Sequence, residues 1–507
     1  MTDPNDEREM GIAGVGAYAP RRYVTNETVA EAWGQFAGSG VQQTAVSAAD
    51  EDSLTMAATA ARLTLDAAVV DAAQVGRLAI GTTTPPTEEP GMSARLVSML
   101  GLEASTTTRQ FGGSANAGVA ALAGSLDTDV GVHATGDEAV LVVASDTVRG
   151  DPDSAVDHAG GAGAAAVVLT PDAGGRVRAI GEHTATYPGT RVRGAGQREA
   201  EGLEITAYDR QAYRETVGGA VDALCGSLTE AEAGVAVGDV DAAAVGAPDG
   251  SLPYRASDAL GVDRETISAG STVHVLGDCG TATPLLGLAR ALDEGNGSVL
   301  VVGYGAGSEA TALVVDSAEE VPVARRTAGT TEVSYAEYLR LRGEITSGDP
   351  AGGGAYVSVP SWRRTLPQRH RLIAGRCPEC GTLAFPPEGA CRDCHELAEY
   401  EPVRLARRGT VETATTIGQG AAPPEFAEQQ ARGGSYVSAV VAFQVADEVE
   451  TDADGDRSVS VPMQVVECEK TPTVGTDVVT TIRRIYEQEG VIRYGLKAVP
   501  AVAERSQ

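Results

Sequence analysis

The chain has 507 residues, of which 42% are hydrophobic, and its 39 Lys+Arg against 70 Asp+Glu give a formal net charge of −31. This length predicts two or three domains, and the sequence has no run of about 18 apolar residues that could span a membrane. The acidic balance disfavours duplex nucleic acid as a partner, because phosphate binding requires a basic face.

The basic residues have an unusual composition. Only Lys470 and Lys497 are lysines, and the others are arginines. An acidic, lysine-poor surface on a normal apolar core is typical of halophilic proteins from salt-accumulating cells, where concentrated cations screen self-repulsion. An acidic solubility bias of another cause is the alternative. Residues 1–10 are polar and acidic, unlike a secretory leader, so the sequence predicts a cytoplasmic protein.

Residues 10–320 alternate between short apolar runs and Ala-rich stretches. Helices are predicted at Ser53–Val70, Ala117–Leu122 and Tyr208–Leu228. This alternation predicts a layered α/β domain. The predicted strands are Gly11–Ala19, Leu78–Thr84, Ala139–Thr147, Ala164–Leu169, Asp241–Ala247, Ser298–Tyr304 and Ala310–Asp316.

An internal repeat lies within this region. "EAVLVVASDTVRG" followed by "GAGAAAVVLT" is matched about 160 residues later by "GSVLVVGYGAG" followed by "EATALVV". A strand, a Gly-rich turn and a second strand therefore occur twice, which indicates a duplicated α/β half. Chance similarity is the alternative, because Val-rich runs are ordinary buried strands.

A domain boundary is predicted where apolar periodicity disappears, at 318–333. We expect a linker at 321–360, with a short amphipathic helix at 334–343 and a flexible connector at 346–356. Short strands with turn signals fill residues 401–502 and suggest a small barrel. These strands are predicted at Thr410–Ile417, Tyr436–Val445, Ser458–Val466 and Asp477–Tyr486, with a solvated acidic insert at 446–457.

Four cysteines between these regions have the spacing C-x2-C-x10-C-x2-C: Cys377, Cys380, Cys391 and Cys394. Two such knuckles can bring four thiolates to the corners of one tetrahedron, which zinc accepts in a closed structural site. A pair of disulfides or a redox C-x-x-C is less favoured, because no secretory leader is present and the two pairs come as a set. The sequence therefore predicts a zinc ribbon at 361–400 that folds a module and does no chemistry.

Several segments carry a family resemblance, and they occur in the family's order. They are "GIAGVGAYAPRRYVTNETVAEAWG" (11–34), "AADEDSLTMAATAAR" (48–62), "GTTTPPTEEPGMSARLVSMLGL" (81–102), "GAGAAAVVL" (161–169) and "GYGAGSEATALVV" (303–315). This set resembles the thiolase superfamily and, within it, the archaeal 3-hydroxy-3-methylglutaryl-CoA synthases. The resemblance implies a five-layer αβαβα fold, an acyl-CoA ligand, and either a homodimer through the central sheets or an assembly with a true thiolase.

The C-terminal region resembles a second family. "CPECGTLAFPPEGACRDC" and "YGLKAVPA" (494–501) are similar to proteins that pair a rubredoxin-like zinc ribbon with an OB-fold. Members of that family occur beside or fused to thiolase-like proteins of acyl-CoA metabolism, so the two resemblances support each other.

The resemblance also locates the catalytic positions, and each departs from the family's pattern. Ala115 stands where the family's nucleophilic cysteine belongs, and Thr83 stands where its glutamate belongs. Gly246 or Ala247 takes the place of the histidine, and Asp278 takes the place of the asparagine. Four changes together predict that ordinary condensation is absent, and that the chain binds an acyl-CoA as a scaffold or partner.

An active acyltransferase with a remodelled site is the alternative. Cys279 would then be the nucleophile, with Asp278 and His158 beside it, although Cys279 and His158 also suit plain packing roles. His274 is predicted to lie in a strand as a core histidine. The family's glycine-rich loops place CoA contacts at Gly305, Gly307 and Ser308.

A third function, binding of single-stranded nucleic acid, rests on the zinc ribbon and OB-fold alone. It requires a basic groove with stacking aromatics. Basic residues equally suit the phosphates of CoA, and the whole chain is acidic. The residues concerned are Arg364, Arg369, Arg371, Arg376, Arg404, Arg407 and Arg408, with Trp362 and Phe385.

Overall fold

The structure is a computed structural model, and it describes residues 10–126, 138–171, 173–228, 237–307, 309–317, 320–345, 357–418, 420, 422–446, 458–488 and 490–501. The chain divides into two compact units, Met1–Tyr338 and Leu339–Gln507, each with its own apolar core. The predicted connector at 346–356 and the insert from 447 to 457 lie outside the described residues. Within these ranges, none of the helices could serve as a membrane span.

The first unit contains two halves with the same strand order. The order is β4-β6-β7-β1 in the first half and β9-β10-β11-β8 in the second. In each half the first pair of strands is parallel, and the next two pairs are antiparallel. The duplication predicted from the two Val-rich segments is confirmed, because these segments form β6–β7 and β10–β11. The strands are β1 (Met10–Tyr18), β4 (Val75–Gly81), β6 (Ala139–Thr147), β7 (Ala162–Pro171), β8 (Gly175–Thr184), β9 (Ala242–Val245), β10 (Ser298–Gly305) and β11 (Glu309–Ser317).

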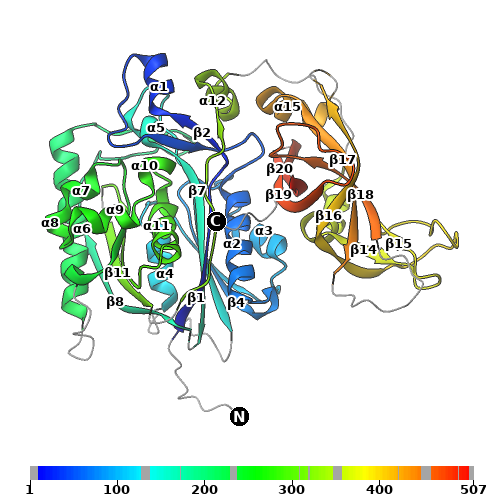
Figure 1. Cartoon of the computed structure of the whole chain (residues 1–507), viewed down its shortest axis with the longest axis horizontal. Helices are drawn as coiled ribbons and strands as arrows, with labels where there is room; N and C mark the ends of the chain where they lie inside the picture. Colours follow the sequence, from blue (N-terminus) through cyan, green and yellow to red (C-terminus); the bar gives the residue numbers. More distant parts are fainter. Residues whose placement is uncertain are drawn as a thin grey trace, which may run out of the picture. The chain divides into compact units, whose positions relative to one another are not determined.

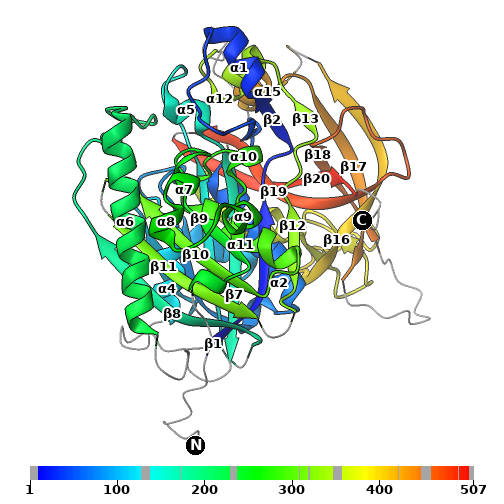
Figure 2. The same ribbon diagram turned by 60° about the vertical axis from the view of Figure 1, so that its left-hand side comes forward.

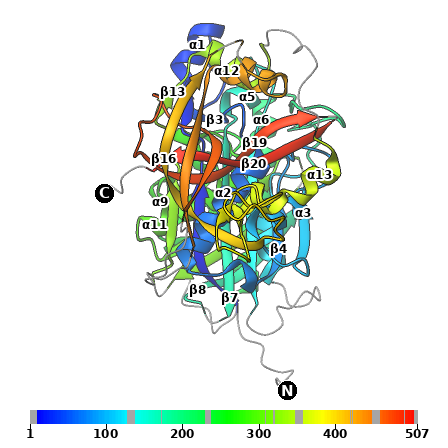
Figure 3. The ribbon, with the colours of Figure 1, turned by 90° about the vertical axis from the view of Figure 1, so that its right-hand side faces the viewer.

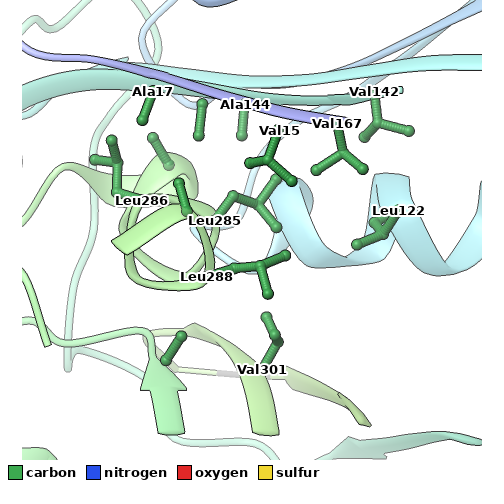
Figure 4. Packing of buried hydrophobic residues seen from close by; sticks show 14 of the residues in the cluster. Val15, Ala17, Leu122, Val142, Ala144, Val167, Leu285, Leu286, Leu288 and Val301 are labelled. Carbon is green, nitrogen blue, oxygen red and sulfur yellow. The ribbon is translucent and has the colours of Figure 1, made fainter. Parts of the chain in front are cut away.

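Two helices lie between the halves of this sheet. The helices α4 (Ala117–Leu126) and α11 (Thr283–Asp293) contact strands of both halves. Figure 4 shows leucines of α11 packed between Val167 on one side and Val301 on the other. The outer faces are covered by α2 (Ser53–Ala68) over the first half and α6 (Thr206–Ser227) over the second (Figures 1 and 2). The expected five-layer αβαβα arrangement is confirmed.

Local chemistry explains where α2 begins. Oδ1 of Asp52 accepts a hydrogen bond from the Thr55 N–H at 3.0 Å, and Oγ1 of Thr55 accepts one from the Asp52 N–H at 2.9 Å. This capping box satisfies two backbone donors at the helix start, which is Ser53 as predicted. Gly16 of β1 allows the helix to lie close to the sheet, because a Cβ there would collide with Thr64.

The structure differs from the sequence prediction at the boundary of the first unit. Residues 323–326 form β12, which pairs with β1, and residues 331–332 form β13, which pairs with β2. The first unit therefore continues to Tyr338, and the segment from 321 is part of its sheets where a linker was expected. The short helix predicted at 334–343 is present as α12 (Tyr335–Arg342).

Short elements complete the first unit. Among the strands of this unit, β2, β3, β5, β8, β12 and β13 were not predicted. The remaining elements are β2 (Arg22–Thr25), α1 (Asn26–Trp33), β3 (Gln43–Val46), α3 (Ser93–Leu100), β5 (Thr107–Phe111), α5 (Ala155–Ala159), α7 (Leu252–Arg255), α8 (Ser257–Leu260), α9 (Arg264–Gly270), α10 (Val273–Leu276), β12 (Val323–Arg326) and β13 (Thr331–Glu332).

The second unit joins a cysteine-rich ribbon to a closed five-stranded barrel (Figure 3). The barrel strands are paired in the order β16-β17-β18-β20-β19, and β19 pairs back with β16. Closure in this order, with β18 parallel to β20, confirms the expected OB-fold. The elements are α13 (Val359–Arg364), α14 (Leu366–Arg371), β14 (Ile373–Arg376), β15 (Leu383–Ala384), β16 (Glu401–Ile417), α15 (Ala427–Gly433), β17 (Tyr436–Val445), β18 (Ser458–Val465), β19 (Asp477–Gln488) and β20 (Val491–Pro500).

Candidate functional site

Ala115 lies two residues before Ala117, the first residue of the buried helix α4, and is partly exposed. Its neighbour Asn116 fixes the start of the helix against β11. Nδ2 of Asn116 donates to Oγ1 of Thr311 at 2.9 Å, and the Thr311 N–H donates to Oδ1 of Asn116 at 3.1 Å. A helix N-terminus favours negative charge, so this position suits a thiolate or an oxyanion. The methyl group of Ala115 cannot form a thioester.

Ser114, the adjacent residue, has no base to activate it. Its Oγ accepts a hydrogen bond from the Asn116 N–H at 3.2 Å, and among the described residues no imidazole or carboxylate bonds to it. Gly305 lies so close that a Cβ there would collide with the Ser114 hydroxyl. A hydroxyl without a base is a poor nucleophile.

Gly305 and Gly307 of the predicted CoA loop lie among the described residues. Contacts within the chain explain why each of them is a glycine. Gly305 makes room for Ser114, and Gly307 has φ +91 and accepts a hydrogen bond from the Tyr187 N–H at 2.9 Å. Ser308 lies outside the described residues. A contact of this loop with CoA therefore stays a prediction.

Asp146, near the end of β6, accepts several hydrogen bonds at the base of the site. We call this base the site floor. Asp146 is fully buried, and its carboxylate accepts hydrogen bonds from the backbone N–H groups of Thr83 (2.7 Å) and Thr281 (2.9 Å). Oγ1 of Thr83 also donates to Oδ2 of Asp146 at 3.0 Å, and Thr82 and Thr84 add further bonds. The predicted strand through Thr84 ends at Gly81 because the chain turns here onto this carboxylate. Thr83, at the family's glutamate position, is thus a hydrogen-bond donor to an anion and cannot act as a base.

Two tyrosines occupy the space beside the histidine position. The hydroxyl of Tyr213 donates to the Gly246 carbonyl at 2.8 Å, and the Tyr304 ring packs edge-on against Tyr213 with centroids 4.6 Å apart. A Cβ at Gly246 would lie 2.9 Å from the Tyr304 backbone nitrogen, so a larger side chain there requires a shift. Burial raises the pKa of both phenols, which keeps them neutral.

Asp278, at the family's asparagine position, forms a buried ion pair. Its Oδ2 lies 2.8 Å from Nη1 of Arg191, and its Oδ1 accepts a hydrogen bond from the Gly280 N–H at 2.8 Å. The side chains are only 6% and 19% exposed, respectively. A buried carboxylate of this kind depends on its cation, because removal of one partner leaves an uncompensated charge.

Arg191 belongs to a hairpin that sequence reasoning did not identify. We call residues 187–203 the site hairpin, because Val192 and Glu201 exchange backbone hydrogen bonds at 2.7 and 2.8 Å. Arg193 of the same hairpin donates to the Thr83 carbonyl. The segment "RVRGAGQRE" offered a signal, since two arginines two residues apart lie on one face of an extended strand.

Cys279 is buried and points away from solvent. Its side chain is 1% exposed within the main core cluster, and Sγ lies 3.8 and 3.7 Å from the carbonyl oxygens of Leu276 and Gly277. Burial raises the pKa of this thiol well above its usual range. These observations favour a packing role over a nucleophilic one.

The backbone segments that carry His158 and Asp278 are hydrogen-bonded to each other, but the two side chains are not paired. The Asp278 N–H donates to the Ala159 carbonyl at 2.7 Å. The His158 ring stacks on Phe36 at 5.3 Å, and its Nδ1 accepts a hydrogen bond from the Ala37 N–H at 2.9 Å. Burial lowers the pKa of His158, so its neutral form is favoured.

His274 was expected in a strand, and this prediction is wrong. It lies in the short helix α10, where its ring bonds to the Tyr254 hydroxyl at 2.8 Å and the Gly40 carbonyl at 2.6 Å. The short apolar run around His274 does not distinguish a strand from a helical turn.

The four cysteines of the second unit form one cluster. Their Sγ atoms all lie within 4.8 Å of one another, with 3.5 Å between Cys380 and Cys391 and 3.7 Å between Cys377 and Cys394. Four sulfurs about 2.3 Å from a zinc ion lie about 3.8 Å apart, so these residues fit a structural zinc. Thr382 beside Cys380 lowers the pKa of that thiol to about 6, which favours the thiolate that zinc binds.

The two aromatic residues that the nucleic-acid hypothesis invoked, Trp362 and Phe385, pack within the second unit. The Trp362 ring lies between the guanidinium carbons of Arg369 (3.9 Å from its centroid) and Arg493 (5.0 Å), and its side chain is 7% exposed. Phe385 packs against the barrel core. Nucleic-acid bases would need free stacking faces, so the geometry gives the nucleic-acid hypothesis no support.

The layered duplicated fold, with its site at the start of α4, defines a thiolase-like domain of the condensing-enzyme class. The chain is 30% identical to "Hydroxymethylglutaryl-CoA synthase" of Aeropyrum pernix over 358 residues, which covers 67% of this chain and 96% of that protein. The corresponding protein of Caldivirga maquilingensis is 27% identical, over 66% of this chain and 97% of its own length. The chain therefore belongs to the hydroxymethylglutaryl-CoA synthase family.

Two further comparisons agree with the fold. The solved structure "MvaS in complex with 3-hydroxy-3-methylglutaryl coenzyme A" superposes with a TM-score of 0.55 at 22% identity, covering 70% of this chain and 94% of that chain. A family model described as "ChsH2, rubredoxin-like zinc ribbon domain" matches residues 364–398, which contain all four cysteines. The chain thus combines a synthase-family domain with a zinc ribbon and an OB-fold.

Proposed function

We propose that this protein binds an acyl-CoA in its first unit without forming a covalent acyl-enzyme, and that it serves as a scaffold or partner for another enzyme of acyl-CoA metabolism. The observation that carries the proposal is Ala115, which stands at the start of α4 where the family's nucleophile belongs. Ligand binding can persist without catalysis, because a CoA tunnel binds its ligand through its shape and backbone groups. It does not require the side chains that transfer protons. The relative whose title names bound 3-hydroxy-3-methylglutaryl coenzyme A supports this ligand class.

The neighbouring side chains support the same conclusion. Thr83 donates its proton to Asp146, and the thiol of Cys279 is enclosed in the core. Nδ1 of His158 accepts a hydrogen bond from the Ala37 N–H. The described residues therefore offer no thiolate with an adjacent base, which condensation through a thioester requires.

The second unit supports a role in assembly. A closed four-thiolate site stabilises a fold and leaves no coordination position for a substrate. In the proposal, zinc holds the ribbon in shape and the ribbon with its OB-fold positions the protein beside a partner that does carry a nucleophile. An assembly with a true thiolase fits this role.

A homodimer through the central sheet is the partner arrangement that the first unit supports. Strand β5 lies at one end of the strand order, with β4 as its neighbour. A depression of about 690 Å³ beside it is lined by apolar residues such as Leu78, Phe111, Leu126, Val140 and Ile180, and also by Arg77, Arg109, Ser125 and Glu182. A sheet edge with no further strand among the described residues, beside a largely apolar depression, is a pairing surface. Light scattering on the purified protein should give twice the chain mass, and Ser125→Arg in this depression should halve it.

The acidic composition supports adaptation to concentrated salt. A net charge of −31 destabilises a compact chain through self-repulsion, and salt screens that repulsion. The melting temperature should therefore rise as KCl is increased from about 0.1 M to about 3 M. A melting temperature independent of KCl would remove this part of the proposal.

The proposal is tested by measuring binding and turnover on the same sample. Calorimetric titration with acetyl-CoA should show binding, while a thiol-trapping assay should show no release of free CoA with acetyl-CoA and acetoacetyl-CoA together. Release of CoA that is lost in Cys279→Ala would instead establish the remodelled acyltransferase. Absence of binding by any acyl-CoA would contradict the proposal.

A further inference from the structure

The site hairpin brings two guanidinium groups to the floor of the site. Residues 191–193 run antiparallel to Glu201, so the side chains of Arg191 and Arg193 leave the strand on the same side. Arg191 reaches Asp278 in the second half of the fold, and Arg193 reaches the Thr83 carbonyl in the first half. The hairpin therefore bonds to both halves of the fold, at Asp278 and at Thr83.

Most of the hydrogen-bonding capacity of Arg191 is unused. A guanidinium has five N–H donors, and among the described residues only Nη1 of Arg191 has a hydrogen-bond partner. The side chain is 19% exposed, so part of it remains open to solvent. The fork geometry of arginine matches the two oxygens of a carboxylate.

The local charges favour an additional anion. Asp278 neutralises Arg191, whereas Arg193 bonds a neutral carbonyl and has no carboxylate partner within the described part of the chain. The other carboxylate of the floor, Asp146, is fully buried and already accepts bonds from three backbone N–H groups and three hydroxyls. The N-terminal end of α4 adds a positive partial charge at the same place.

We propose that Arg191 is a specificity-determining residue, and that the site selects a CoA thioester whose acyl chain ends in a carboxylate. The inference rests on the proposed function, since it names the acyl class that the site binds. With the thioester beside Ala115, the acyl chain extends toward the hairpin, and its terminal carboxylate takes the unused donors of Arg191 with support from Arg193. Asp278 holds the guanidinium in place for this contact and is a positioning residue.

The test compares matched acyl chains by calorimetric titration. Succinyl-CoA and butyryl-CoA differ by a carboxylate in place of a methyl group, as do glutaryl-CoA and valeryl-CoA, while the CoA part is constant. We expect the carboxylated member of at least one pair to bind roughly 10- to 100-fold more tightly, the range for hydrogen bonds to a charged group. The double variant R191Q/D278N should abolish that preference, so that the two members of the pair bind with equal affinity.

The choice of variants keeps the result interpretable. R191Q alone leaves Asp278 as a buried, unpaired carboxylate and can destabilise the fold, whereas the double variant restores a neutral pair. R198Q is the matched control, because Arg198 lies exposed on the same hairpin and carries the same charge; it should retain the preference.

Three outcomes would overturn the inference. Equal affinity of the wild-type protein for both members of each pair would remove it while leaving acyl-CoA binding intact. Equal weakening of both members in R191Q/D278N would show that Arg191 contacts a phosphate of CoA instead. Absence of binding by all four thioesters would contradict the proposed function as well.

Discussion

The backbone N–H of Thr281 donates to Oδ2 of Asp146 at 2.9 Å, and this contact joins the two duplicated halves at the floor of the site. Asp146 lies one residue before the end of β6 in the first half, and Thr281 precedes α11 of the second. The backbone of the second half comes so close to Asp146 here that a Cβ at Gly280 would collide with the same carboxylate. Gly280 also has φ +56, which favours glycine. The site is therefore built around one buried acceptor that receives donors from both halves.

Asp146→Asn should destabilise the first unit strongly. The amide nitrogen would replace an oxygen that now accepts from Thr83 and Thr281, and a buried donor without its acceptor costs about 1–3 kcal/mol. The melting temperature of the first unit, measured by calorimetry, should fall by several degrees. Asp316→Asn is the control, because its ion pair with Arg178 is partly exposed and contributes about 1 kcal/mol or less. Equal shifts for the two variants would contradict the central role of Asp146.

Zinc should be bound at one ion per chain by the cysteine cluster. Cys391→Ser should abolish the zinc measured by elemental analysis, because three thiolates do not close the structural site. Cys225→Ser, at an exposed cysteine of α6, should retain it. Zinc should also be released in acid, since protons compete with the metal for the four thiolates. Full zinc content in the Cys391 variant would contradict this assignment.

His158 should make the first unit less stable in mild acid. Burial lowers its pKa in the folded state, whereas the unfolded chain takes up the proton near the ordinary value of about 6.5. Below that pH the unfolded state binds more protons, so the free energy of unfolding falls as the pH falls. His158→Asn should reduce this loss between pH 7 and 5 in denaturant titrations. His183→Asn, at a partly exposed histidine of β8, is the matched control and should follow the wild-type profile.

Patterns that depend on local sequence predicted much of the fold. The strand at Ala139–Thr147 and the start of α2 were predicted to the residue, because a continuous Val-rich run and a capping aspartate are local signals. The cysteine spacing predicted the cluster for the same reason. The edge strand β5 was missed, since its residues are polar and its pairing with β4 comes from tertiary structure.

The site was only partly predictable. The resemblance located Ala115, Thr83, Gly246 and Asp278, and the structure brings their elements together. It could not show that Arg191 pairs with Asp278, 87 residues away in the chain. It also could not show that Cys279 faces the core, because the direction of a side chain in a turn depends on packing from β7 and α11.

The most direct test of the account is the intact mass of the protein after incubation with acetyl-CoA, for the wild type and for Ala115→Cys. The account predicts no adduct on the wild type and one acetyl group on the variant, because the start of α4 lowers the pKa of a cysteine placed there and the bound thioester lies beside it. Cys279→Ala in the variant background should leave that adduct unchanged. An acetyl group on the wild-type protein that disappears in Cys279→Ala would contradict the account.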